Sequence, residues 1–141
     1  MRPLTPVTVL AMLCLFASPV FADDSFDENV NVVVAPLEGS PSFDTYTKHA
    51  IAVIKEGVPG ARVLESSPDT LAGEPAHRVV FSGFLGKCPM KWLQIWTLRG
   101  RRACVVTYSA DAADYEKRLP SALNAIRSLS FEGVGQNGGK R

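Results

Sequence analysis

Three segments rich in apolar and β-branched residues follow one another in this chain, and only short turn-forming links separate them. The segments span residues 76–84, 89–98 and 103–110. Parallel strands need a crossover of a dozen or more residues, so links this short force antiparallel hairpins. A turn centred on Gly100 and Arg101 pairs Thr97 with Cys104. The spacing thus predicts a meander of three antiparallel strands.

Both faces of these central strands carry apolar side chains. In segment 89–98 one face presents Trp92 and Trp96, while the other presents Leu93 and Ile95. A sheet with one solvated face would alternate apolar and polar residues more cleanly. We therefore expect this sheet to be covered on both sides.

Two amphipathic segments can supply that cover. The first is predicted to begin after Ser42, a good N-cap residue, and to run to about Glu56; the second has Pro120 at its first position and runs to about Leu129. Two more strands are expected at residues 29–37 and 62–66, and a loop of turn-forming residues at 68–75. The predicted fold class is α+β: an αβα sandwich, with an antiparallel β-sheet flanked by helices.

The first 22 residues have the order of a secretory signal peptide. Arg2 carries the only side-chain charge, an apolar run follows, and small residues end the segment at Ala22. Cleavage there would leave a single domain at residues 23–132 and a glycine-rich, disordered tail at residues 133–141. We expect export to the periplasm or the extracellular space, with no transmembrane segment after cleavage.

The net charge of the chain bears on whether its partner is a nucleic acid. Loss of Arg2 would leave 14 basic side chains against 14 acidic ones. A nucleic-acid-binding protein normally has a basic excess that displaces counterions from phosphates. We therefore expect no nucleic-acid partner.

Several segments together resemble the PsbP-like family. They are residues 29–34 (NVNVVV), 71–81 (LAGEPAHRVVF), 91–97 (KWLQIWT), 105–110 (VVTYSA) and the closing stretch from Tyr115 to Phe131. The resemblance covers nearly all of the chain after the leader. The residues that carry it (the glycine-proline loop, the aromatic strands and the closing Phe131) are of the kind that shape a fold, and none is of the kind that performs catalysis.

The resemblance implies an αβα sandwich and a binding role without established catalysis. The wider fold group includes extrinsic photosystem II subunits, a Ran-binding nuclear protein, toxin chaperones and exported bacterial DcrB-type proteins. The photosystem subunits have a long transit peptide and a basic N-terminal segment, whereas this chain has a short leader followed by Asp23 and Asp24. An exported bacterial member fits better than a photosynthetic one.

Two features could form an interaction surface. Arg99, Arg101 and Arg102 make a hairpin tip that could dock a carboxylate-rich partner or anionic headgroups, or could simply protect a sheet edge. Trp92 and Trp96 share one strand face and could form a stacking platform, or could be core beneath a helix.

No residues form a recognisable catalytic, cofactor or metal site. Cys88 and Cys104 are expected to be separate thiols, because Cys88 lies nine positions, roughly 30 Å, before Thr97, the expected neighbour of Cys104. His49 and His77 have no ligands at metal spacing. Asp111, Asp114 and Glu116 lack the pattern of a calcium loop.

We therefore expect a non-enzymatic binding or accessory protein of the cell envelope that acts as a monomer through contacts with an unknown protein partner. A periplasmic protein that binds a small ligand or lipid is the first alternative. A protein like the photosystem II extrinsic subunits is the second.

Overall fold

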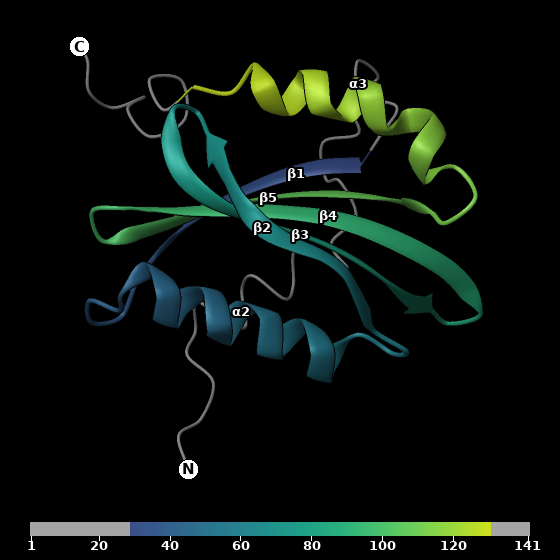
Figure 1. Cartoon of the computed structure of the whole chain (residues 1–141), viewed down its shortest axis with the longest axis horizontal. Coiled ribbons are helices and arrows are strands. Elements are labelled where there is room, and N and C mark those ends of the chain that lie inside the picture. Colours follow the sequence, from purple (N-terminus) through teal and green to yellow (C-terminus); the bar gives the residue numbers. More distant parts are fainter. Residues whose placement is uncertain (1–28, 131–141) are drawn as a thin grey trace.

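A five-stranded sheet separates two helices in the computed structural model, which describes residues 29–130 (Figure 1). The elements are β1 (Asn29–Pro36), α2 (Phe43–Gly57), β2 (Arg62–Leu71), β3 (Glu74–Leu85), β4 (Cys88–Arg99), β5 (Arg102–Asp111) and α3 (Tyr115–Arg127). The helices lie on opposite faces of the sheet. This is the predicted α+β sandwich. The predicted leader (1–22) and tail (133–141) lie outside the described residues.

The sheet is antiparallel throughout, with the strand order β1-β5-β4-β3-β2. The expected hairpin register is confirmed, since Thr97 pairs with Cys104 and Leu98 pairs with Ala103. β1 adds to the far side of β5, the last strand in the sequence. Strands β1 and β2 therefore form the two edges of the sheet.

Helix α2 begins where the sequence predicts. Ser42 is its N-cap, and the Ser42 hydroxyl accepts a hydrogen bond of 3.0 Å from the backbone N–H of Thr45. Asp44, in the first turn, forms an ion pair of 3.3 Å with Lys48 on the solvent side. An acid there also complements the helix dipole. The opposite side of α2 packs on the sheet.

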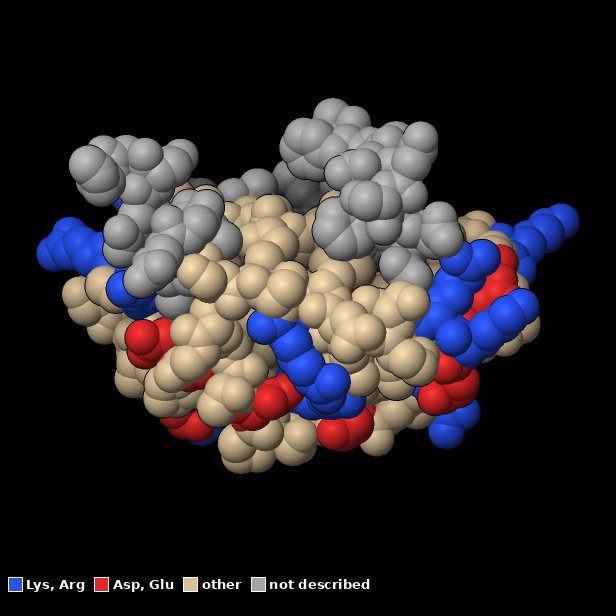
Figure 2. Space-filling model, turned by 90° about the horizontal axis from the view of Figure 1, so that it is seen from above, with Lys and Arg blue, Asp and Glu red and all other residues tan. Residues whose placement is uncertain are grey.

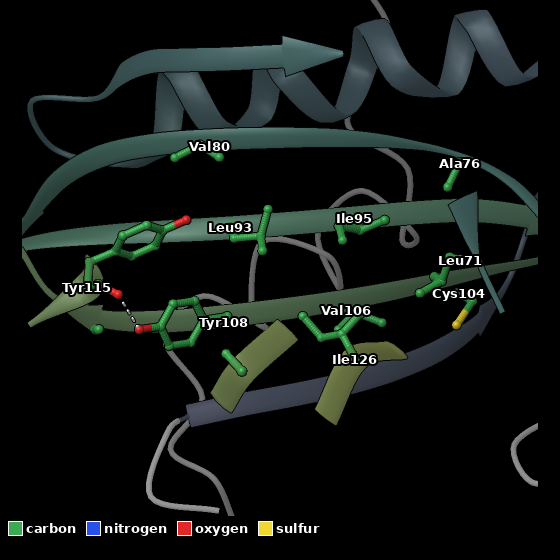
Figure 3. Packing of buried hydrophobic residues seen from close by; sticks show 12 residues of the cluster. Leu71, Ala76, Val80, Leu93, Ile95, Cys104, Val106, Tyr108, Tyr115 and Ile126 are labelled. Atoms are coloured by element: carbon green, nitrogen blue, oxygen red, sulfur yellow. Dashed lines mark hydrogen bonds between the residues drawn. The ribbon is translucent and has the colours of Figure 1, made fainter. Parts of the chain in front are cut away.

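Each face of the sheet has its own apolar core. The core on the side of α2 consists of Tyr46, Ala50, Ile54, Val58, Val79, Phe81, Met90, Trp92, Trp96, Ala103 and Val105. The core on the side of α3 consists of Leu71, Ala76, Val80, Leu93, Ile95, Cys104, Val106, Tyr108, Ala110, Tyr115, Ala122 and Ile126 (Figure 3). The alternation along β4 thus feeds both cores, as its sequence indicates.

The connection after α2 crosses close over β3 at Gly83. A Cβ atom there would lie 2.4 Å from Val58 Cγ1 and 2.9 Å from the Pro59 carbonyl oxygen. The neighbouring Phe84 N–H donates a 3.0 Å hydrogen bond to that same carbonyl. Only glycine lets the two backbones approach this closely.

The prediction of a loop at residues 68–75 is wrong. β2 continues to Leu71 and β3 begins at Glu74, so Ala72 and Gly73 alone form the turn between them. Both have positive φ, 52° and 84°, which suits a tight hairpin. Pro68 is tolerated because β2 is an edge strand, where a missing N–H need not break a ladder hydrogen bond.

The start predicted for the second helix is also wrong. Helix α3 begins at Tyr115 and contains Pro120 in its interior instead of at its first position. Its apolar side, with Tyr115, Ala122 and Ile126 buried, packs on the sheet and outweighs the local cost of the proline. Within residues 29–130, no helix has the length and apolarity needed to cross a membrane.

Candidate interaction surface

Trp92 and Trp96 are core residues and not a surface platform. Both side chains are 0% exposed. The ring of Trp92 stacks on Phe81 at 5.1 Å, and Trp96 donates a 2.9 Å hydrogen bond from Nε1 to Thr47 Oγ1 on α2. Of the two interpretations that the sequence leaves open, the structure shows the buried one, because α2 lies over this face.

The arginine tip (Arg99, Arg101 and Arg102) is exposed at the end of the β4–β5 hairpin. Gly100 makes the turn with φ of 62°, a conformation that L side chains rarely adopt. The Arg101 carbonyl accepts a 2.7 Å hydrogen bond from the backbone N–H of Leu37, just beyond β1. The turn backbone is therefore held against the chain that leaves β1, while its guanidinium groups reach solvent.

Charged side chains are mixed over the face seen from the side of α3. Figure 2 shows basic side chains toward both ends of this face, with acidic ones among them. Several of these side chains form ion pairs that local sequence patterns do not indicate, because the partners lie on different elements. Arg78 contacts Glu65 at 3.3 Å and Asp69 at 3.6 Å, joining β3 to β2. Lys91 contacts Glu116 at 2.9 Å and lies 4.5 Å from the centre of the Tyr115 ring.

The edge strand β1 presents exposed apolar side chains beside the arginine tip. Val32 and Val34 are each 37% exposed, and Pro36 pairs with Arg102 of the tip. The sequence predicts β1 as a strand, but the exposed surface along it was not predicted. Eight uncharged residues were the available indication, but the edge position depends on pairing with β5, more than 60 residues away.

The two histidines lie in different surroundings. His77 Nε2 lies 2.8 Å from Ser66 Oγ, and its ring stacks on Trp96 at 5.8 Å; burial lowers the pKa of His77. His49 lies exposed on α2. In the part of the chain that the structure describes, no three His, Cys, Asp or Glu side chains gather as metal ligands would.

The two described cysteines are free thiols, as the register argument predicts. Cys104 is buried on the α3 side, whereas Cys88 is exposed at the start of β4. The Cys88 thiol donates a 3.4 Å hydrogen bond to Asp111 Oδ1, and this bond, with the negative charge of Asp111, raises the pKa of Cys88. Of the other acids tested against a calcium loop, Asp114 is the N-cap residue of α3 and Glu116 lies in its first turn.

A five-stranded antiparallel sheet with one helix on each face is the PsbP-like α+β fold. No family model matches the sequence, and no curated protein matches it. The fold is shown by solved structures.

Three of these structures share the fold at low sequence identity. PA94 from Pseudomonas aeruginosa, a putative regulator of unknown function, has a TM-score of 0.60 at 15% identity, over 76% of this chain and 85% of its own. Cyanobacterial PsbP from Synechocystis has a TM-score of 0.54 at 13% identity, over 72% and 65%. LpqN from Mycobacterium tuberculosis, involved in cell envelope biogenesis, has a TM-score of 0.54 at 20% identity, over 77% and 64%. This chain thus spans less than two thirds of the latter two proteins.

Proposed function

We propose that this protein is an exported, non-enzymatic accessory protein of the cell envelope that binds a protein partner through the arginine tip. The observation that carries this proposal is the geometry of that tip: three arginines on one exposed turn whose backbone is fixed to the β1 end by the Leu37–Arg101 hydrogen bond. A fixed turn loses less conformational freedom on binding than a mobile loop does.

The chemistry of the tip indicates an acidic partner. Guanidinium groups bind carboxylates through paired N–H donors, and arginine is common among residues that dominate protein interfaces. The cell-envelope setting is supported by the signal-peptide pattern of residues 1–22 and by the fold shared with LpqN. Because Trp92 and Trp96 are buried, they offer no stacking platform to a small ligand, and the arginine tip is the exposed one of the two expected surfaces.

A capture experiment with two matched charge-reversal variants tests the function. The protein purified from its native envelope after chemical crosslinking is compared with an Arg99→Glu/Arg101→Glu/Arg102→Glu variant. The control is Lys55→Glu/Lys87→Glu/Lys117→Glu, which reverses three exposed charges on other elements and so changes the net charge equally.

The proposal expects a protein that the wild type and the lysine variant capture and the arginine variant loses. With the purified pair, binding by the arginine variant should weaken by at least ~10-fold, or ~1.4 kcal/mol, and should weaken with salt in the wild type. Equal loss in both variants would make the effect one of net charge. If no form captures a protein, the proposed function fails, and ligand screening by thermal shift tests the alternative.

A further inference from the structure

The edge strand β1 has the composition of a strand that accepts another strand. None of its eight residues, NVNVVVAP, is charged, and four of them are valine. Among the described residues β1 pairs with β5 alone, so its other side ends the sheet. A long, uncharged, β-branched edge of this kind is a template for further pairing unless something protects it.

The opposite edge, β2, carries protection along its length, whereas the one proline of β1, Pro36, stands at its last position. Its register shifts between Val63 and Glu65, so that Leu64 forms a bulge. Pro68 lies in the middle of the strand, and Glu65 and Asp69 form ion pairs with Arg78. Bulges, prolines and charges are the usual means by which sheets block pairing at an edge. Within residues 29–130, these devices thus block the β2 edge, and none of them lies in the interior of β1.

The exposed valines of β1 extend the core on the α3 side to this open edge. Residues that pair across an antiparallel ladder point to the same face, so Val32 lies beside Val106 and Val34 beside Cys104. Both of these β5 residues are buried members of that core. A strand added to β1 would place its own side chains against Val32 and Val34 and remove apolar surface from water.

We propose that β1 pairs antiparallel with β1 of a second copy of this chain, about a two-fold axis at Val32. This register sets Val32 opposite Val32 of the second copy and Val34 opposite Val30 of the second copy. A two-fold axis gives a closed dimer, whereas a parallel pairing of two identical edges could not close. The result is one continuous ten-stranded sheet, and it departs from the monomer expected from the sequence.

Charge complementarity selects a second copy as the occupant. The residues before β1 in the sequence include four acids, Asp23, Asp24, Asp27 and Glu28, while the arginine tip lies at the other end of β1 with Glu38 as the one acid of the loop that follows. Antiparallel pairing sets Asn29, the residue that follows these acids in the sequence, opposite Ala35 of the second copy, at the end of β1 where the arginine tip lies. The uncharged strands between them meet without repulsion.

The valines of β1 choose the register. Only residues on the same face can oppose each other, so a well-overlapped pairing centres on Val32 or on Val33. Centring on Val33 would set Val30 opposite Pro36 of the second copy. Centring on Val32 sets Val30, Val32 and Val34 each opposite a valine of the second copy, which buries more apolar surface. The Val32 register is therefore favoured.

The mass of the purified exported protein in solution tests the dimer without any partner present. Sedimentation equilibrium is run on the wild type, on Val32→Lys/Val34→Lys, on the single variant Val32→Lys, and on Leu64→Lys, which places the same single charge as Val32→Lys on the blocked edge. Leu64 is 51% exposed, so all substituted positions reach solvent. Circular dichroism and thermal melting establish that each variant is folded.

We expect the wild type and the Leu64 variant to have twice the chain mass and the Val32 and Val32/Val34 variants to have the single mass. A wild type that is monomeric up to hundreds of micromolar, or a Val32/Val34 variant that stays dimeric, overturns the proposal. If a monomeric wild type captures an envelope protein that the Val32/Val34 variant loses, the edge belongs to that protein instead. The capture experiment reads the arginine variant and the mass measurement reads the Val32/Val34 variant, so a failure of the arginine-tip function and a failure of the dimer are distinguished.

Disulfide crosslinking tests the register in a chain with Cys88→Ser and Cys104→Ala. Val32→Cys in this background should form a covalent dimer on mild oxidation, since the two thiols meet at the axis. Val34→Cys should not, because the register separates the two Val34 positions by four residues, ~13 Å along the strands, beyond the ~7 Å reach of a disulfide. Faster crosslinking at Val34 than at Val32 contradicts the register.

Discussion

At the scale of single residues, local contacts decide how the cysteines behave. Cys88 is exposed, but its thiol donates a hydrogen bond to the carboxylate of Asp111. That bond and the negative charge of the acid both favour the neutral thiol, and the pKa of Cys88 rises. Because the thiolate is the reactive form, exposure alone does not make Cys88 reactive. Cys104 is buried, and burial raises its pKa as well.

Thiol labelling without reductant should follow this arrangement. In the folded protein we expect one thiol, Cys88, to react slowly at pH 8, and both to react after unfolding. Asp111→Asn should speed the native reaction by lowering the pKa of Cys88, whereas Glu116→Gln, which removes an acid elsewhere, should leave the rate unchanged. A chain that takes up no label after unfolding would contain a disulfide and would contradict the β4–β5 register.

At the scale of elements, helix α3 shows packing overriding a local preference. Pro120 has no N–H to donate to the Glu116 carbonyl one turn earlier, and its ring crowds that carbonyl. The side chain of Pro120 is exposed, so its packing adds little to the stability of the protein. The helix persists because Tyr115, Ala122 and Ile126 are buried against the sheet.

Pro120→Ala should therefore stabilise the protein. A proline in a helix interior costs ~3 kcal/mol relative to alanine, while restriction of the unfolded chain returns roughly 0.4–1 kcal/mol. We expect a net gain of ~2 kcal/mol in the free energy of unfolding, measured by urea denaturation. Ser121→Ala, at the next exposed position, should gain only a few tenths. A loss of stability in Pro120→Ala would mean that the ring makes a contact worth more than its helix penalty.

At the scale of the whole molecule, local spacing predicted the central meander but not what lies at its ends. Short links fixed the β3–β4–β5 order, and the apolar residues on both faces of β4 indicated the two helical layers. The placement of β1 beside β5 depends on long-range pairing, so its exposed edge could not be recognised. The continuation of β2 through Pro68 was missed because turn-forming residues are also tolerated at a sheet edge. The arginine tip was predicted as a surface, whereas the fate of Trp92 and Trp96 required the position of α2.

The predicted cleavage site lies close to the edge strand β1 in the sequence. If cleavage follows Ala22, the new N-terminus at Asp23 lies six residues before Asn29, the first residue of the edge strand. An uncleaved chain would instead retain an apolar leader ahead of that strand in the sequence. Processing would thus change both the attachment of the protein to the membrane and the length of chain that precedes β1.

N-terminal sequencing of the exported protein should therefore begin at Asp23. Ala22→Trp should block cleavage, because the site requires a small residue, and the precursor should accumulate in the membrane fraction. Ala22→Gly keeps a small residue and should be processed like the wild type. An exported wild type that begins at Met1 would show an anchored protein, with the apolar leader retained ahead of β1. The edge strand would then act next to the bilayer, and any pairing through it would be confined to copies held on the same membrane surface.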